Sequence, residues 1–352
     1  MTSYTKQRFS PLNSTLTFVA YKSVFNFYAM NLIFSFVFLF VSANKALTSE
    51  HCENINFLDE STITTLSKAA IPELSRDKRK GAAGKIIVIG GSVEYTGAPY
   101  FAAISALKVG ADLVYVITTE DAAPVIKSYS PDLIVHPIRN IHSLSKINAL
   151  LPKAHVVVIG PGLGREPDDL ALVYEIIGTC KSLKKALVID ADGLYAIDKN
   201  VSILKDYPSP GAILTPNHLE AKRLKDAIVH SKVHWYNYWG TNVSVLQKGQ
   251  EDEYHSSIGN LAWKISDIGS GRRAGGQGDI LAGSLATFFH WAIESNLCKN
   301  HSVNVAQSIA AYSAAKFTRT CNFKAYTKLG RSMTASDMIN EIHSSFTELL
   351  DQ

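Results

Sequence analysis

Short hydrophobic runs alternate with helix-like stretches along most of the chain. The runs lie at 85–89, 112–117, 133–135, 156–159, 187–190, 212–214 and 243–246. Because nearly every residue in each run is apolar, we expect strands buried on both faces, as in a parallel sheet covered by helices. Helical composition at 98–109 and helical spacing from Ile280 to Leu350 fit this arrangement. The pattern predicts an α/β fold, an α/β/α sandwich with a central, mostly parallel sheet.

The most marked polar segment is 269–279, in which five glycines precede Asp279 and an apolar helix. Backbone N–H groups of residues 275–278 at this helix start would form an anion site suited to phosphate. A carboxylate there would repel phosphate unless it met a metal or a proton-bearing group. We therefore interpret Asp279 as a base aimed at a hydroxyl to be phosphorylated. The alternative is that Asp279, as the first helical residue, only caps its helix.

Other polar residues follow the predicted strands, where ligands bind to parallel sheets. The segment 160–164 has G-x-G-x-G spacing with an inner proline, and it forms either a tight turn or a ligand loop. Asp190 and Asp192 would hold Mg²⁺ or form an Asx turn. Glu220 would coordinate Mg²⁺ bridging ATP phosphates, or only stabilise the helix dipole. Lys248 would face phosphate or remain a solvated loop charge.

The N-terminal segment has a targeting composition. Residues 1–49 contain no carboxylate, but they carry several basic residues and many Ser and Thr. We interpret this segment as a mitochondrial transit peptide that begins at Met1. The alternatives are a secretory signal that begins at Met30 and a cytoplasmic form of the protein. The apolar run 32–41 is short for a membrane anchor, which needs about 20 residues. We expect residues 1–50 to be a targeting extension and 51–352 to be a single domain without a stable membrane anchor.

The charge distribution and the cysteine spacing argue against two kinds of function, nucleic-acid binding and structural zinc binding. Hydrophobic residues make up 46% and charged residues 19% of the chain, and the net charge of +4 is not gathered into a basic stripe. Nucleic-acid binding is therefore not predicted. The four cysteines form no Cys-x-x-Cys pair or Cys/His cluster, which argues against structural zinc. The segment 229–240, rich in His, Trp and Tyr, is predicted to be a surface insertion, either a lid or a loop packed on its own side chains.

The order and spacing of the motifs resemble those of the eukaryotic ATP-dependent NAD(P)H-hydrate dehydratases, within the ribokinase-like superfamily. The resemblance runs from about Leu66 to the end and rests on 85–91, 95–99, 158–164, 188–193, 214–220, 247–249, 272–279 and 330–338. It implies a ribokinase-like sandwich and an enzyme, a hydro-lyase that repairs damaged nicotinamide nucleotides. ATP would phosphorylate the ring hydroxyl of the S form of hydrated NADH or NADPH (NAD(P)HX), with Mg²⁺ as cofactor. Elimination would then regenerate NAD(P)H and release ADP and phosphate.

The resemblance also implies two sets of site residues. The NAD(P)HX site would comprise Gly164, Asn217, His218, Leu219, Glu220, Ala221, Lys222, Arg223 and Asp279. The ATP site would comprise Lys248, Gly249, Gln250, Glu251, Asp252, Gly269, Ser270, Gly271, Arg272, Arg273, Ala274, Gly275, Gly276, Gln277 and Gly278. Ala221 departs from the family pattern, in which a larger, often aromatic residue follows the glutamate. This departure bears on substrate packing and not on the reaction.

Two other functions remain open at this stage. A ribokinase-like kinase of a vitamin or sugar alcohol would share the anion site and the Asp279 base. A nucleotide-binding sensor without catalysis is a second alternative, although the presence of Asp279 argues against it. The expected partners are NADHX, NADPHX and ATP, with a separate NAD(P)HX epimerase as a companion enzyme. ATP or ADP as donor, substrate preference and homo-oligomerisation are not determined by the sequence.

Overall fold

The computed structural model describes residues 59–138, 144–228, 233–258, 261–298 and 302–351. The predicted targeting extension at 1–50 lies outside these residues, so its role and processing stay predictions. In the described part of the chain, no helix is long and apolar enough to cross a bilayer.

Nine strands of the described residues form one sheet in the order β3-β2-β1-β4-β5-β6-β7-β8-β9. Neighbouring strands from β3 to β7 pair in parallel, whereas β8 and β9 are antiparallel additions at one edge. The strands are β1 (Lys85–Ile89), β2 (Leu113–Thr119), β3 (Ile134–Ile138), β4 (Val156–Ile159), β5 (Ala186–Ile189), β6 (Ala212–Leu214), β7 (Val243–Gln247), β8 (Asp252–His255) and β9 (Trp263–Ile265). The predicted mostly parallel sheet is confirmed.

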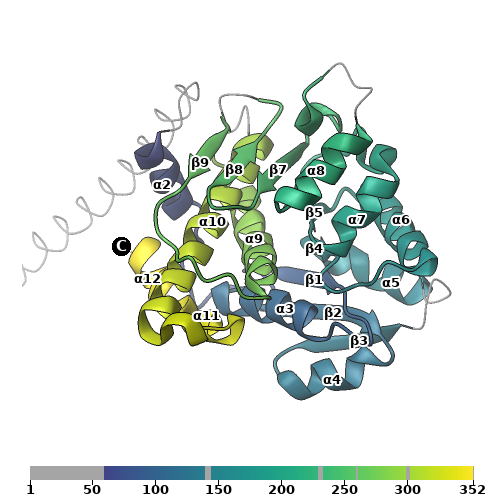
Figure 1. Cartoon of the computed structure of the whole chain (residues 1–352), viewed down its shortest axis with the longest axis horizontal. Helices are drawn as coiled ribbons and strands as arrows, with labels where there is room; N and C mark the ends of the chain where they lie inside the picture. Colours follow the sequence, from purple (N-terminus) through teal and green to yellow (C-terminus); the bar gives the residue numbers. More distant parts are fainter. Residues whose placement is uncertain (1–58, 139–143, 229–232, 259–260, 299–301, 352) are drawn as a thin grey trace, which may run out of the picture. The chain divides into compact units, whose positions relative to one another are not determined.

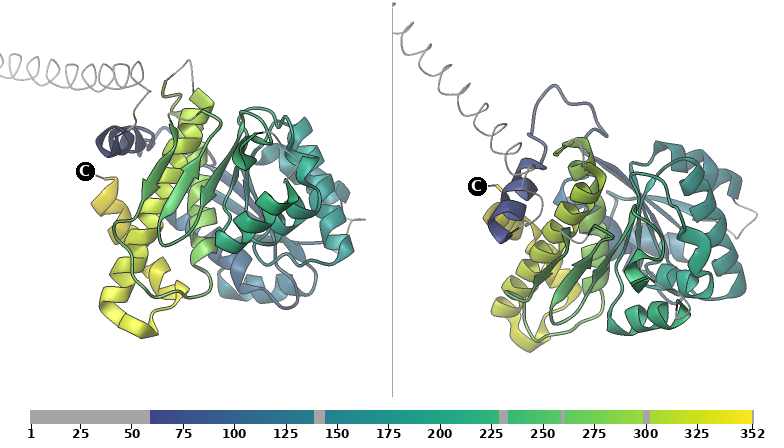
Figure 2. Two further views of the ribbon diagram at one scale, coloured as in Figure 1. Left: turned by 45° about the horizontal axis from the view of Figure 1, so that its top comes forward. Right: turned by 90° about the horizontal axis from the view of Figure 1, so that it is seen from above.

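Helices cover both faces of this sheet, which confirms the α/β/α sandwich (Figures 1 and 2). Alternate strand residues enter two separate cores: Ile86 and Val88 point to one, and Ile87 and Ile89 to the other. The first face carries α2 (Glu60–Ala69), α3 (Gly97–Val109), α4 (Ala122–Tyr129), α9 (Gln277–Glu294), α10 (Ser302–Leu329), α11 (Ala335–Asn340) and α12 (Ile342–Leu349). The second carries α5 (Leu144–Leu150), α6 (Pro167–Ser182), α7 (Asp192–Lys199) and α8 (His218–Ala227).

Close packing of α3 on α9 depends on one glycine. A Cβ atom at Gly283 would lie 1.9 Å from the carbonyl oxygen of Ala102, so only glycine lets the two helices approach this closely. This contact fixes α9, and with it the position of Asp279, against the centre of the sheet.

The hydrophobic pattern missed β8 and β9. Their sequences, Asp-Glu-Tyr-His and Trp-Lys-Ile, mix charged and aromatic residues, because β8 is fully buried only at alternate positions and β9 lies at the edge of the sheet. In the described part of the aromatic segment, 233–240, Trp239 is fully buried and its indole N–H donates to the carbonyl oxygen of Val201 at 2.7 Å. Trp235 and Tyr238 contact Trp239 edge-on, so the prediction of a loop packed on its own side chains is supported. Residues 229–232 lie outside the described part.

Candidate active site

Lys248 and Asp190 form an ion pair at the carboxyl edge of the sheet. Lys248 follows β7 and Asp190 follows β5, and the Lys248 Nζ lies 2.5 Å from the Asp190 Oδ1. The same carboxylate oxygen accepts a hydrogen bond from the Thr215 hydroxyl, just after β6, at 2.8 Å. The ends of three neighbouring parallel strands therefore meet at one polar cluster, as expected for a ligand site in an α/β sheet.

The Lys248 ammonium group stays charged in this cluster. Its side chain is 19% exposed and that of Asp190 is 2% exposed. Burial alone would lower the pKa of Lys248, but the carboxylates of Asp190, Glu220 and Asp279 raise it above its ordinary value. The interpretation of Lys248 as a solvated loop charge is therefore wrong, because its ammonium group is held by an ion pair at the carboxyl edge of the sheet.

Asp279 lies next to this ion pair, in the first turn of α9. A Cβ atom added at the preceding residue, Gly278, would be 3.1 Å from the Lys248 Nζ, which places the two segments in contact. Burial raises the pKa of Asp279 to about 7, with a further rise from Asp190 and Asp192 that Lys248 opposes. A carboxylate that titrates near neutral pH is suited to take a proton from a substrate hydroxyl.

The start of α9 differs from the prediction by two residues. The helix begins at Gln277, its N-cap is Gly276 in a left-handed conformation (φ 92°), and this cap makes no side-chain hydrogen bond. Asp279 is thus the third helical residue and not the first, and it does not occupy the cap position that the alternative interpretation requires. The backbone N–H groups of the first helical turn have no intrahelical partner, so they can bind an anion.

Gly276 is the glycine on which this anion loop depends. A Cβ atom there would lie 2.6 Å from the Ala335 side chain and 2.8 Å from the Phe101 ring. The Gln277 side-chain amide closes the loop by donating to the carbonyl oxygen of Arg272 at 3.0 Å. The predicted segment 269–278 is therefore a compact loop that ends on the helix start.

The residues predicted to bind NAD(P)HX are partly brought to this cluster. Asn217 and Glu220 form a capping box at the start of α8, in which the Glu220 Oε2 accepts from the Asn217 backbone N–H at 2.8 Å. The Gly164 backbone N–H donates to Asp192 at 3.1 Å, and His218 and Leu219 are exposed beside the cap.

Three members of this predicted set lie on other parts of α8. Ala221 is buried in the core, so its side chain is unavailable to a ligand. Lys222 pairs with Asp226 at 2.6 Å along the exposed side of the helix. Arg223 is half-buried near the charge of Glu220. Backbone contacts or the cap itself, more than these side chains, would serve a ligand.

The magnesium assignment of Glu220 gains no support from the geometry. Its Oε2 is used by the cap, and the described residues contain no group of three or more His, Cys, Asp or Glu side chains arranged to hold a metal ion. Asp190 is paired with Lys248, and Asp192 pairs with Arg165 at 2.7 Å. A Mg²⁺ ion bound mainly by phosphate oxygens and water, with one or two carboxylates nearby, would still fit this edge.

The residues predicted to bind ATP form two loops that touch each other. Gly249, Gln250 and Glu251 are exposed, as are Gly271, Arg273 and Gly275, while Ser270, Arg272 and Ala274 are half-buried. The guanidinium of Arg273 reaches across to the Gly249 carbonyl oxygen at 3.4 Å. Asp252 is the exception, because it is buried and its Oδ1 accepts from the Gly249 backbone N–H at 3.0 Å.

Several residues that hold these loops were not predicted. Thr215 positions Asp190, Arg319 pairs with Asp252 at 3.3 Å, and Asn322 accepts a hydrogen bond from the Ser270 backbone N–H at 2.7 Å. Arg319 and Asn322 are polar residues buried on α10. Their burial marks them as structural residues, but it is visible only in the structure and cannot be read from the sequence alone.

Comparisons with known proteins identify the family of this chain. A family model for NAD(P)H-hydrate dehydratase matches residues 86–343. The ATP-dependent (S)-NAD(P)H-hydrate dehydratase of Drosophila pseudoobscura pseudoobscura is 48% identical over 285 residues, covering 81% of this chain and 92% of the relative. The enzyme of the same name from Danio rerio is 42% identical over 334 residues, covering 92% of this chain and all of the relative.

Solved structures place the fold in the same group. A ribokinase-like superfamily protein from Enterococcus faecalis has a TM-score of 0.64 at 17% identity, over 82% of this chain and 95% of its own. An ADP/ATP-dependent NAD(P)H-hydrate dehydratase from Bacillus subtilis, co-crystallized with ATP and Mg²⁺, has a TM-score of 0.58 at 19% identity, over 84% of this chain and 99% of its own. The ribokinase-like fold is thus confirmed, and with the extent of the family match it follows that this chain belongs to the NAD(P)H-hydrate dehydratase family.

Proposed function

We propose that Asp279 takes the proton from the ring hydroxyl of hydrated NADH or NADPH while the γ-phosphoryl group of ATP is transferred to that oxygen. As a member of its family, the chain is an ATP-dependent dehydratase of the S form of NAD(P)HX. The observation that carries the assignment is the position of the Asp279 carboxyl group, in the first turn of α9 and beside the ion pair of Lys248 and Asp190. Burial, which raises the pKa of Asp279 to about 7, suits it to this role.

Each part of the cluster has a role in the transfer. The N–H groups of the first turn of α9 and the Lys248 ammonium would stabilise the negative charge of the transferring phosphoryl group. Asp190 and Thr215 hold Lys248 in place. Asp279 accepts the hydroxyl proton, which makes the oxygen a better nucleophile.

Phosphorylation makes the following elimination feasible. Hydroxide is a poor leaving group, whereas phosphate leaves readily as the lone pair of the ring nitrogen forms a C=N double bond to the carbon that carried it. The resulting iminium ion then loses a proton from the neighbouring ring carbon to water, which forms the carbon–carbon double bond of NAD(P)H. The products are NAD(P)H, ADP and phosphate. Mg²⁺, when bound, would neutralise charge on the donor phosphates, and Glu220, Asp190 and Asp192 are the carboxylates at this edge of the sheet that could hold it together with water.

A turnover assay tests this function. Purified protein is given hydrated NADH, Mg²⁺ and either ATP or ADP, and the return of NADH absorbance is followed together with nucleotide consumption. We expect recovery of NADH with one nucleotide consumed per NADH formed, and the preferred nucleotide identifies the donor. Nucleotide binding without recovery would contradict the dehydratase and favour a small-alcohol kinase, because that reaction would use the same base and anion site.

The cellular context is a separate proposal. The acid-free segment 1–49 supports delivery to mitochondria, and a separate epimerase would supply the S form from the R form. Imaging of the full chain and of a variant starting at Met30, each fused to a fluorescent protein at Gln352, tests the address. Secretion or cytoplasmic retention of the full chain would exclude delivery to mitochondria.

A further inference from the structure

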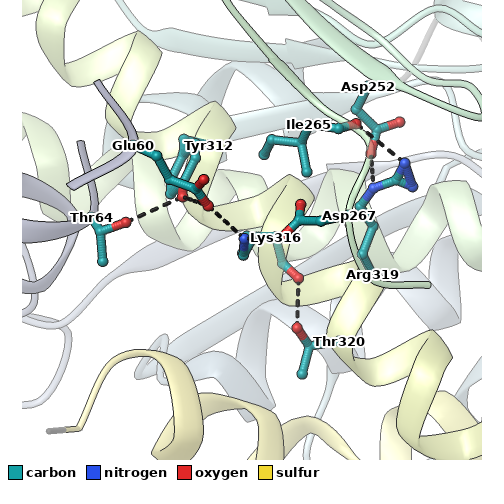
Figure 3. A network of polar contacts seen from close by, with 9 residues as sticks. All are labelled: Glu60, Thr64, Asp252, Ile265, Asp267, Tyr312, Lys316, Arg319 and Thr320. Atoms are coloured by element: carbon teal, nitrogen blue, oxygen red, sulfur yellow. Dashed lines mark hydrogen bonds and ion pairs between the residues drawn. The ribbon is translucent and has the colours of Figure 1, made fainter. Parts of the chain in front are cut away.

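Arg319 of α10 contacts the predicted ATP loop that follows β7 and the end of β9, from which the second predicted ATP loop starts. Its side chain is 8% exposed, and its Nε lies 3.3 Å from the Asp252 Oδ2 (Figure 3). Its Nη2 donates to the carbonyl oxygens of Gln250 and Ile265, the second at 3.2 Å. One buried guanidinium therefore holds the turn after β7 and the end of β9, in addition to the β8–β9 pairing that sets Asp252 opposite Ile265.

Each of these contacts is linked to a residue of the predicted ATP loops. The other carboxylate oxygen of Asp252 accepts from the Gly249 backbone N–H at 3.0 Å, so Arg319 acts through Asp252 on the residue next to Lys248. Ile265 leads directly into the loop that ends at Gly276, the N-cap of α9. Asn322, nearly one turn after Arg319, accepts from the Ser270 backbone N–H at 2.7 Å and adds a second anchor to that loop.

Lys316, about one turn before Arg319, holds the start of the same loop. Its Nζ bridges the Glu60 Oε1 at 2.7 Å and the Asp267 Oδ2 at 2.5 Å (Figure 3). The Tyr312 hydroxyl also donates to the Glu60 Oε1 at 3.1 Å. Through this bridge α2, which lies outside the matched range 86–343, is tied to the ATP loop.

The loop between these anchors has an unfavourable backbone conformation. Ile268, a β-branched residue, has φ 58°, and Gly269 follows with φ 105°. Left-handed geometry is strongly disfavoured for a β-branched residue and persists only where surrounding contacts impose it. Asp267 on one side and Ser270 on the other are the residues through which α10 imposes it.

We propose that Arg319 and Lys316 are positioning residues for the phosphoryl donor, and that α10, braced by α2, sets the spacing of the two ATP loops. Neither side chain touches the nucleotide. The proposal rests on ATP being the donor, as in the proposed function. Its expected consequence is specific: loss of either side chain weakens nucleotide binding, while binding of the hydrated cofactor is preserved.

Substitutions in the full chain test this proposal. Arg319→Met and Lys316→Met are compared with Lys328→Met, which breaks the 2.7 Å pair with Glu341 elsewhere on α10. We expect both test variants to raise the KM for ATP and the Kd for ADP about tenfold, since a tenfold change corresponds to about 1.4 kcal/mol, the net contribution of roughly one or two hydrogen bonds. The KM for hydrated NADH and the kcat at saturating ATP should change far less, and Lys328→Met should change none of these values.

Further variants separate positioning from stability alone. Arg319→Lys keeps the charge but loses the planar fork that reaches two carbonyls, so it should restore only part of the ADP affinity. Arg319→Met combined with Asp252→Asn should lose less affinity than the two single changes together predict, because both act on one chain of contacts. Should Arg319→Met fail to fold, Lys316→Met and the exposed Asp267→Asn provide the same test through the loop start.

The outcomes are distinct from those of the turnover assay. ADP affinity is measured by calorimetry and requires no dehydratase activity, so it reports on the loops even if the wild-type protein fails to regenerate NADH. Arg319→Met and Lys316→Met variants with a lower Tm but wild-type Kd for ADP would overturn the proposal. An equal loss of affinity in Lys328→Met would also overturn it, because the effect would then belong to helix stability.

Discussion

The Lys248 ammonium nitrogen lies 2.5 Å from the Asp190 carboxylate, and both groups act on Asp279 with opposite sign. Asp190 raises the pKa of Asp279 because two nearby anions repel, whereas the Lys248 cation lowers it. Burial gives the largest rise, and the balance of the three influences leaves Asp279 at about 7. The ion pair therefore adjusts a neighbouring base as well as presenting a cation to phosphate.

Replacing Asp279 should abolish turnover and preserve nucleotide binding. Asp279→Asn keeps the shape of the side chain but cannot accept the hydroxyl proton, so we expect turnover to fall by at least about 10²–10⁴-fold. The Kd for ADP should remain within a few-fold of wild type, because the loop backbone and Lys248 are unchanged. Stopped-flow absorbance and calorimetry measure the two quantities, and wild-type turnover in this variant would exclude Asp279 as the base.

Activity should depend on pH through the same carboxyl group. The base works when deprotonated, so kcat/KM should rise with pH through the Asp279 pKa of about 7 and level off above it. Asp190→Asn removes one cause of the raised pKa, and the midpoint should therefore move to lower pH. Movement to higher pH would show that the disturbed Lys248 dominates, contrary to the arrangement described here.

Much of this site could be predicted from the sequence, for an identifiable reason. Asp279, Gly276 and Lys248 each follow a strong local pattern: a glycine-rich loop before an apolar helix, or a polar residue directly after a hydrophobic strand. Asp190 was visible as a residue at a strand end, but its hydrogen bond with Thr215 joins separate strands, and that contact is a property of the sheet order. Local patterns predict element ends, and the tertiary fold decides which ends meet.

Contacts between residues far apart in the sequence could not be predicted, because they too depend on the tertiary fold. The buried pair of Asp252 and Arg319 joins residues on β8 and α10, and neither partner is unusual in its own sequence context. The family resemblance implied Asp252 as an ATP contact, and in the structure its carboxylate is bound by Gly249 and Arg319. Glu220 was interpreted from the sequence as a Mg²⁺ ligand or a stabiliser of the helix dipole, whereas the structure shows its carboxylate in a capping box with Asn217.

A methyl group at Gly276 should damage the anion loop. Gly276→Ala forces a side chain into a left-handed position within 2.6 Å of Ala335 and 2.8 Å of Phe101, so the loop must move. We expect loss of stability of about 1–3 kcal/mol and a marked rise in the KM for ATP. Gly178→Ala on α6 is the matched control, because a Cβ atom there meets nothing within 4 Å.

The control carries its own expectation. Alanine is favoured over glycine inside a helix by roughly 0.5–1 kcal/mol, so Gly178→Ala should raise the Tm slightly and leave the KM for ATP unchanged. Thermal melts and steady-state kinetics on both variants provide the comparison. A Gly276→Ala enzyme with a wild-type KM for ATP would show that this glycine is not needed at the anion site.

Stability should fall in acid because of a pair of stacked histidines under α9. The rings of His155 and His290 lie 4.1 Å apart, and the His290 Nε2 is 3.1 Å from the Ala82 carbonyl oxygen. Burial, the charge of His290 and the neighbouring cations Lys85 and Lys185 lower the pKa of His155 to about 4, from an ordinary value of 6.5. Burial also lowers the pKa of His290.

The sign follows from proton uptake on unfolding. Between pH 6.5 and about 4 the unfolded chain binds a proton at His155 that the folded chain does not, so unfolding becomes easier as the pH falls through this window. We expect a loss on the order of 1–3 kcal/mol from this residue. Denaturant titrations at pH 7.5 and 4.5 on wild type and His155→Gln measure it. The variant should lose less stability between the two pH values, and an equal loss in both proteins would assign the acid sensitivity to other groups.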